Sequence, residues 1–150
     1  MQVEQPVALY KLRSSEPQIF LVDRRTVAMI GRLEELFTTV GLDRIPSDQL
    51  PPIVLELPAT VLRKLIEWCD HHKFDAPFDE SQPLPAELPD WDTNFFMIRH
   101  TLLFDLLRAA RHFDVPGLFS MCCHVVQQNP LEIMGGLFND VPQERSAAAA

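Results

Sequence analysis

The sequence predicts an α+β fold, with a small β-sheet and helices in the first half of the chain and a helical extension in the second. Three observations support this expectation. Up to residue 72, alternating segments and helical periods follow one another in the order β-β-α-β-α. A proline-rich acidic segment then breaks every period. Beyond it, apolar residues recur only at helical spacing.

These observations divide the chain into four parts. We expect an α/β portion at residues 1–77, an acidic, proline-rich loop at 78–89, a helical extension that completes the domain at 90–140, and a frayed tail at 141–150. A chain of 150 residues is long enough for one domain with its own core.

The strands are predicted from alternation. Residues 7–13 (VALYKLR) and 19–22 (IFLV) alternate and are joined by the turn sequence SSEPQ, which predicts a hairpin. A further short strand is expected at residues 53–57 (IVLEL), ended by Pro58.

Two helices are predicted in the first half. Apolar residues at helical spacing predict one continuous helix over residues 24–40, with Asp23 as its N-cap and Gly41 as its stop. A second apolar stripe predicts a helix over residues 59–72.

The extension contains four predicted helices. Their expected ranges are 90–98, 100–113, 116–128 and 129–138. Pro116 and Pro130 suit the first turn of a helix, where the missing N–H would have no partner. Gly135 and Gly136 weaken the last helix by about 1 kcal/mol each.

Charge and composition exclude several classes of protein. A net charge of −8 and a pI near 5.0 argue against a nucleic-acid partner, which needs clustered Lys and Arg. No segment approaches the about 20 apolar residues of a membrane span, and the N-terminus lacks the pattern of a signal peptide. Three cysteines without a C-x-x-C do not form a disulfide framework. We therefore expect a protein of the cytoplasm and nucleus.

The segment LIEWCDHHKFD at residues 65–75 raises the question of a metal site. Cys69 and His72 share one face of the predicted helix, but a closed zinc site needs two more ligands. The candidates elsewhere in the chain are Cys122, Cys123 and His124. Because Cys69 also continues an apolar stripe and paired short spacings are missing, we favour a core helix that ends in cationic residues.

An enzyme is not favoured either. The chain has no Gly-x-Ser-x-Gly, no Walker loop and no Gly-rich turn after a strand. Cys122 and Cys123 lie next to His124 in sequence, but a nucleophile and its base must meet in space. We expect a non-catalytic protein without metal or cofactor.

The helical extension is rich in large apolar residues, in FFMI, TLLFDLL and GLFSMCCHVV. Two explanations stay open: these residues form core, or part of their surface is covered by a partner helix. Exposed apolar surface would also allow the chain to form a homodimer when it has no other partner.

Several of these motifs resemble one family. LRKLIEWCDHHK, LPDWDTNFF and TLLFDLLRAARHFDVPGL follow in the order and approximate spacing of the S-phase-kinase-associated (Skp) adaptor family, which links F-box proteins to cullin in SCF ubiquitin ligases. YKLRSSEPQIFLVD is similar to the opening hairpin of that family, and the resemblance extends over residues 9–138. Elongin C, which shares the BTB/POZ fold, usually lacks the Trp-Asp helix.

The resemblance implies a BTB/POZ α/β domain followed by a helical extension, and the role of an adaptor in a ubiquitin ligase. It implies an F-box-binding surface made of Leu103, Phe104, Leu107, Leu118, Phe119, Cys123, Val126, Ile133 and Leu137. It also implies that Arg111 and His112 contact the N-terminal domain of cullin, at a helix end where the family commonly has an Asn-Tyr pair.

The departures from the family lie on its binding surfaces. Arg111 and His112 change the cullin-facing pair, two glycines replace good helix formers, and the family's last helix does not follow in this sequence. Pro130 occupies a position that is modified in some relatives. The alternative is therefore a divergent or C-terminally shortened paralogue that acts as a scaffold or self-associates outside ubiquitin ligases, for example at a kinetochore or chromosome axis.

Overall fold

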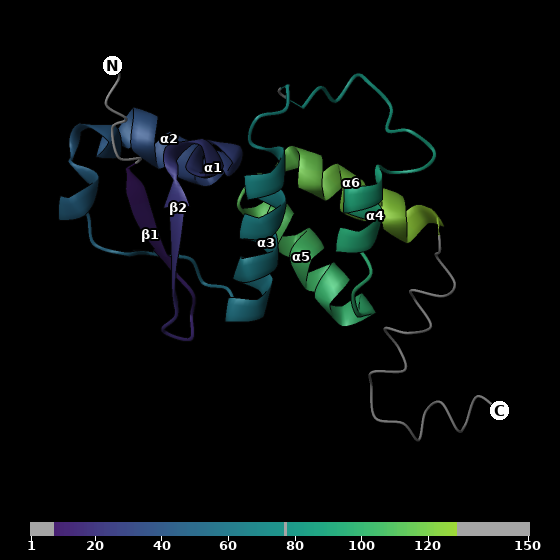
Figure 1. The fold of residues 1–150 in the computed structure, drawn as a ribbon, viewed down its shortest axis with the longest axis horizontal. Helices are drawn as coiled ribbons and strands as arrows, with labels where there is room; N and C mark the ends of the chain where they lie inside the picture. Colours follow the sequence, from purple (N-terminus) through teal and green to yellow (C-terminus); the bar gives the residue numbers. More distant parts are fainter. Residues whose placement is uncertain (1–7, 77, 129–150) are drawn as a thin grey trace, which may run out of the picture. The chain divides into compact units, whose positions relative to one another are not determined.

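The computed structural model describes residues 8–76 and 78–128 (Figure 1). These residues form an α+β chain with a small three-stranded sheet and several helices, which confirms the α+β part of the expected fold. The chain divides into two compact units. The first contains residues 8–76 and 112–115, and the second contains residues 78–111 and 116–128.

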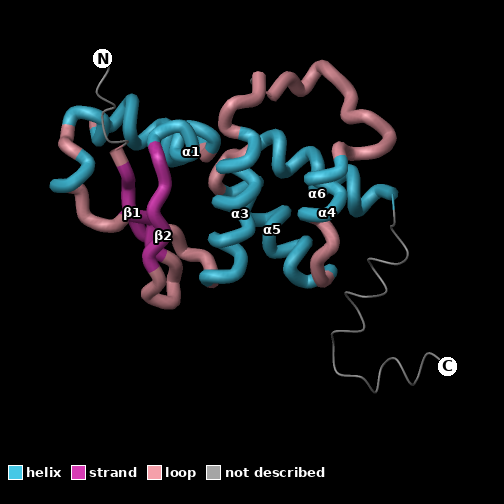
Figure 2. The backbone as a smooth tube through the Cα atoms, in the orientation of Figure 1, coloured by secondary structure: helices cyan, strands magenta, loops and turns pink. Residues whose placement is uncertain are grey.

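The sheet lies in the first unit, where its strands follow the order β2-β1-β3. Strands β1 (Leu9–Arg13) and β2 (Ile19–Asp23) form the predicted antiparallel hairpin and lie side by side (Figure 2). On β1 the buried side chains of Tyr10 and Leu12 alternate with exposed ones. One face of the hairpin therefore belongs to the core, as period-2 patterning predicts.

Strand β3 (Ile53–Val54) pairs in parallel with β1 and is shorter than the predicted range 53–57. The N–H of Leu55 still donates to the carbonyl of Arg13, at 2.9 Å. The N–H of Leu57 instead donates to the carbonyl of Leu55, at 2.7 Å. This local turn interrupts the ladder after Leu55, and the carbonyl of Leu57 then accepts from the N–H of Ser15 at 2.8 Å.

The prediction of one helix over residues 24–40 is wrong. The segment consists of helix α1 (Arg24–Met29), helix α2 (Gly31–Glu35) and the π-helical turn η1 (Leu36–Val40). Ile30 separates α1 from α2 with an extended backbone, at φ −102° and ψ 103°. Gly41 ends the segment as predicted, in the left-handed conformation with φ 107°.

Backbone hydrogen bonds to a distant segment explain the break at Ile30. The N–H of Gly31 donates to the carbonyl of Asp114 at 2.8 Å, and the N–H of Arg32 donates to the carbonyl of Phe113 at 3.0 Å. These acceptors belong to the same compact unit. They satisfy N–H groups that a helix start leaves without intrahelical partners, so α2 begins anew here.

The start of α1 is capped as predicted. The carboxylate of Asp23 accepts a hydrogen bond from the backbone N–H of Thr26 at 2.9 Å.

Helix α3 (Ala59–His72) follows two short 3₁₀ turns, η2 (Leu42–Arg44) and η3 (Ser47–Gln49), and has the predicted bounds. The carboxylate of Glu16 accepts from the N–H of Ala59 at 2.7 Å, and α1 packs beside α3. The largest fully buried side chains of this unit are Leu12, Thr26, Val27, Ile30, Phe37, Leu55, Leu62, Leu65 and Val115.

The second unit contains α4 (Asp90–Phe95), α5 (His100–His112, whose last residue belongs to the first unit) and α6 (Pro116–Gln128). The bounds of α6 are those predicted, whereas α4 is three residues shorter than 90–98. The N–H of Phe96 still donates to the carbonyl of Asp92 as in an α-helix, but the N–H of Met97 donates to the carbonyl of Asn94, only three residues back, and this tighter turn ends the helix. The predicted helix at 129–138 and the tail at 141–150 lie outside the described residues.

No helix within residues 8–76 or 78–128 combines the length and apolar character needed to cross a membrane.

Candidate partner-binding surface

Helix α5 carries three of the residues predicted to bind the F-box. Leu103 is buried, with 2% of its side chain exposed, whereas Phe104 and Leu107 are half-buried. Phe104 and Leu107 are three residues apart and therefore lie on the same side of the helix. These two side chains retain surface that a partner could contact, whereas Leu103 belongs to the core.

Helix α6 carries four more of the predicted residues. Leu118 is fully buried, while Phe119, Cys123 and Val126 are half-buried. The spacing of the last three, at i, i+4 and i+7, places them along one line of the helix. Ile133 and Leu137, the remaining predicted residues, lie outside the described residues, as does Pro130.

The half-buried apolar residues of α5 and of α6 belong to one compact unit, and we name them together the candidate surface. Its members are Phe104, Leu107, Phe119, Cys123 and Val126. Removing apolar and aromatic groups of this kind from water is favourable where a partner covers them. That these residues bind an F-box stays a prediction.

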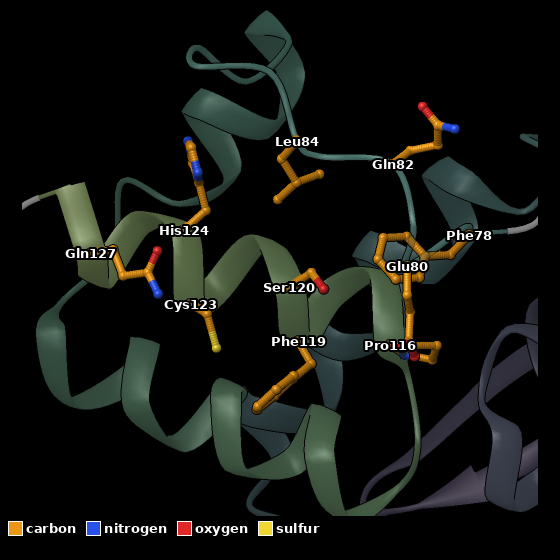
Figure 3. A pocket seen from close by; sticks show the side chains of 10 residues that line it. All are labelled: Phe78, Glu80, Gln82, Leu84, Pro116, Phe119, Ser120, Cys123, His124 and Gln127. Carbon is orange, nitrogen blue, oxygen red and sulfur yellow. The ribbon is translucent and has the colours of Figure 1, made fainter.

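A cavity of about 490 Å³ adjoins α6 (Figure 3). Its α6 wall is formed by residues at helical spacing, namely Pro116, Phe119, Ser120, Cys123, His124 and Gln127. The opposite wall comes from the acidic loop, through Phe78, Glu80, Gln82 and Leu84. The cavity therefore shares Phe119 and Cys123 with the candidate surface.

Two side chains at the end of α6 hold the acidic loop in place. Nε2 of His124 lies 3.2 Å from the carbonyl oxygen of Ala86, and Nε2 of Gln128 donates to the same oxygen at 2.7 Å. A carbonyl has two lone pairs and accepts both bonds. The first requires the His124 tautomer that carries its hydrogen on Nε2. The sequence predicted a loop here but carried no signal for this tether.

The loop also has a turn of its own. The carboxylate of Asp79 accepts from the backbone N–H and the hydroxyl of Ser81, at 3.0 and 2.7 Å. These hydrogen bonds from Ser81 outweigh the effect of desolvation and lower the pKa of Asp79.

The three cysteine thiols are held in their neutral form. Burial raises the pKa of Cys69 and of Cys122 far above the usual value, and the negative charge of Asp70 adds to the shift of Cys69. Burial also raises the pKa of Cys123, which is less enclosed. Since the thiolate is the nucleophile and the zinc ligand, these environments disfavour both roles.

His72 and Lys73, at the end of α3, interact with carboxylates. His72 Nδ1 lies 2.6 Å from Asp75, and Lys73 donates to Asp23 and Asp70 at 2.6 and 2.9 Å. Within residues 8–76 and 78–128, no group of three or more His, Cys, Asp and Glu residues is gathered closely enough to hold a metal ion.

Arg111 and His112, predicted to contact cullin, are the last two residues of α5. Both are exposed. The ring of His112 lies edge-on to the ring of Phe113, with 4.7 Å between the centroids. This contact orients the imidazole at the end of the helix.

Comparison with known proteins adds to these observations. No family model matches the chain. The chain is 31% identical over 121 residues to a Skp1-related protein of Caenorhabditis elegans. The aligned region covers 77% of this chain and 69% of that protein. It is 27% identical over 119 residues to the E3 ubiquitin ligase complex SCF subunit sconC of Talaromyces marneffei and of Talaromyces stipitatus, covering 77% of this chain and 71% of each relative.

Proposed function

The chain belongs to the Skp adaptor family, and we propose that it is a non-catalytic subunit of an SCF ubiquitin ligase that links F-box substrate receptors to cullin. The observation that carries this proposal is the similarity to a Skp1-related protein and to SCF subunits along most of the chain. The half-buried apolar line on α6 supports the F-box side of the proposal.

The proposal includes a BTB/POZ fold for the first part of the chain. A hairpin, a third strand parallel to β1 and helices α1 to α3 are the elements that such a domain would use. The helices of the second unit would then provide the extension that packs against the F-box.

The proposed partners are an F-box protein and the N-terminal domain of cullin. We assign the apolar residues of α5 and α6 to the F-box, and the exposed residues Arg111 and His112 to cullin. The charge of −8 supports the view that nucleic acid is not a partner. The proposed location, cytoplasm and nucleus, is checked by imaging the tagged protein in cells.

Calorimetry with a purified F-box segment tests the first contact. Phe119→Asp and Val126→Asp place a charge on the apolar line of α6, and each is expected to weaken binding by about tenfold or more. Met97→Asp, at a residue of the same unit that is 76% exposed, is the matched control and should leave affinity unchanged. Unchanged affinity in both α6 variants, with folding verified by circular dichroism, would refute the site assignment.

Calorimetry with a cullin N-terminal domain tests the second contact. Arg111→Glu should weaken binding, whereas Arg108→Glu, one turn earlier on α5 and also exposed, should not. Tight binding of the F-box segment without any binding of cullin would favour the scaffold alternative. The proposed homodimer is tested separately by light scattering of the isolated chain, where a monomer at tens of micromolar contradicts it.

A further inference from the structure

We propose that the cavity between α6 and the acidic loop receives a lysine or arginine side chain of the F-box segment, an inference that rests on the proposed function. We name residues 78–88 the strap. In this arrangement α6 provides the apolar line for docking, and the strap provides one carboxylate, that of Glu80, in the wall beside it.

The strap has a hydrogen-bonded turn of its own and is joined to α4 and α6 by further hydrogen bonds. Near its start, Asp79 accepts two hydrogen bonds from Ser81. Near its end, Thr93 of α4 donates its hydroxyl to the carbonyl of Leu88 at 3.2 Å. Between these points, His124 and Gln128 bind the carbonyl of Ala86. These hydrogen bonds hold the strap beside α6, where it forms one wall of the cavity.

The cavity continues the candidate surface. Phe119 and Cys123 belong to both, so a segment that packs on the apolar line of α6 passes the mouth of the cavity. Figure 3 shows the strap residues Leu84 and Glu80 on one side of α6, with Phe119 and Cys123 directed away from the strap. A long side chain from the docked segment could thus reach the cavity from its edge.

The charge of the strap favours a cationic occupant. The strap contains Asp79, Glu80 and Glu87 and has no lysine or arginine. Of the three carboxylates, that of Glu80 belongs to a residue that lines the cavity. An opposite charge brought to this wall is attracted to the carboxylate of Glu80 with the modest strength of an exposed ion pair.

The rest of the lining suits the stem of such a side chain. Lys and Arg carry apolar methylene groups that pack along apolar surface while the charged end reaches a polar group. Phe78 and Leu84 supply the apolar wall, and aromatic rings also attract cations. The volume of about 490 Å³ falls in the range typical of binding pockets.

The test compares two variants of equal charge change. Glu80→Gln removes the carboxylate that lines the cavity, and Glu87→Gln removes one from the same strap outside the lining. Binding of a purified F-box segment is measured by calorimetry at low and moderate salt. We expect Glu80→Gln to weaken binding by about two- to fivefold and to reduce its salt dependence, as for an exposed ion pair. Glu87→Gln should change neither.

The cationic partner is identified by changing each lysine and arginine of the F-box segment singly to glutamine. For one of these changes, the loss of binding free energy should not add to the loss caused by Glu80→Gln. The same change should add to the effect of Glu87→Gln. The double variant His124→Ala, Gln128→Ala removes the two hydrogen bonds to the carbonyl of Ala86. It should therefore reduce the coupling energy between Glu80 and the cationic residue. Thermal unfolding of Glu80→Gln must match the wild type, so that a loss of affinity is not a loss of folding.

The outcomes separate the two proposals. Equal effects of Glu80→Gln and Glu87→Gln, or coupling of Glu80 to no cationic residue, overturn the cavity assignment and leave the adaptor role intact. A wild-type chain that binds no F-box segment overturns both.

Discussion

The backbone N–H of Gly31 donates to the carbonyl oxygen of Asp114 across 2.8 Å, and this contact leaves no room for a side chain at Gly31. A Cβ at this position would lie 2.8 Å from the same oxygen and 2.7 Å from Cγ of Asp114. Asp114 itself has a left-handed backbone, with φ 62°. The glycine is therefore required by close approach, and the hydrogen bond sets the place where α2 begins.

Gly31→Ala is expected to lower the free energy of unfolding by about 1–3 kcal/mol, the usual cost of forcing extra atoms into a packed site. Urea denaturation followed by circular dichroism measures this change.

Gly41 is also required to be glycine, but for a different physical reason than Gly31. It has φ 107°, and the nearest atoms to an added Cβ, on Arg44, are 3.8 Å away. The cost there comes from backbone conformation, which Asn tolerates better than Ala. The free energy of unfolding should therefore be higher for Gly41→Asn than for Gly41→Ala. At Gly31 the order should be reversed, with Gly31→Asn less stable than Gly31→Ala. The same order at both positions would contradict the steric explanation.

Asp23 combines a helix cap with an ion pair. Its carboxylate accepts from Thr26 at 2.9 Å and from Lys73 at 2.6 Å. Desolvation by burial would raise the pKa of Asp23, but the hydrogen bonds from Lys73 and Thr26 outweigh it and lower the pKa. The folded state thus favours the ionised form. The resulting stability is present above about pH 4, the unfolded value, and is lost as pH falls through the lower folded pKa.

Asp23→Asn keeps a capping side chain and removes the charge, so its deficit relative to wild type should shrink as the pH falls below about 4. Asp23→Ala also removes the cap and should cost about 1 kcal/mol more at neutral pH. Urea denaturation at several pH values measures both. Asp48→Asn, at an exposed position in η3, is the control. If the stability deficit of Asp48→Asn shrinks with falling pH as much as that of Asp23→Asn, the pair between Asp23 and Lys73 does not cause the pH dependence.

Arg24 joins two carboxylates beside an aromatic ring. Its guanidinium donates to Asp43 at 2.8 and 2.9 Å and to Glu34 at 2.7 Å, and its Cζ lies 5.0 Å from the centroid of Phe37. Lysine has one charged nitrogen and does not reproduce this planar fork. Arg24→Lys should therefore cost about 1 kcal/mol of unfolding free energy.

The control for this change is Arg108→Lys. Arg108 pairs with Asp105 at 2.6 Å, but its side chain is 69% exposed. Such a pair contributes at most about 0.5 kcal/mol, so the substitution should have little effect. Equal losses from both substitutions, measured by urea denaturation, would show that the fork and the ring contact add nothing.

The cysteines should differ in reactivity. Cys123 is half-buried, whereas Cys69 and Cys122 are buried and burial raises the pKa of each thiol. A thiol reagent added to the native protein should label Cys123 first, and the other two only at the rate of unfolding. Mass spectrometry of the labelled peptides measures this, and Cys123→Ser should abolish the fast phase. Rapid labelling of Cys69 in the native state would contradict the described burial.

The regular helices were predicted well because their signals are local. Pro58 and Pro116 mark the starts of α3 and α6, and the apolar period of each continues to the observed end. Both ranges agree with prediction. The hairpin, too, followed from alternation and a turn sequence, and the cap at Asp23 from residue type.

The break at Ile30 and the tether at Ala86 could not be predicted from the sequence. In each case the deciding hydrogen-bond partner is remote in the chain: the carbonyls of Phe113 and Asp114 for α2, and the side chains of His124 and Gln128 for the strap. Apolar periodicity shows which residues avoid water, but it does not show which backbone group a distant segment will meet.

The sequence by itself thus determined the α+β class, the main helices, and a resemblance that the relatives confirmed as membership of the Skp adaptor family. Only the tertiary structure decided which apolar residues of α5 and α6 keep exposed surface and which, like Leu103 and Leu118, lie in the core. It also decided that the acidic loop forms the wall of a cavity. The physical reason is that burial and hydrogen-bond pairing depend on neighbours in space, whereas helix and strand patterns depend on neighbours along the chain.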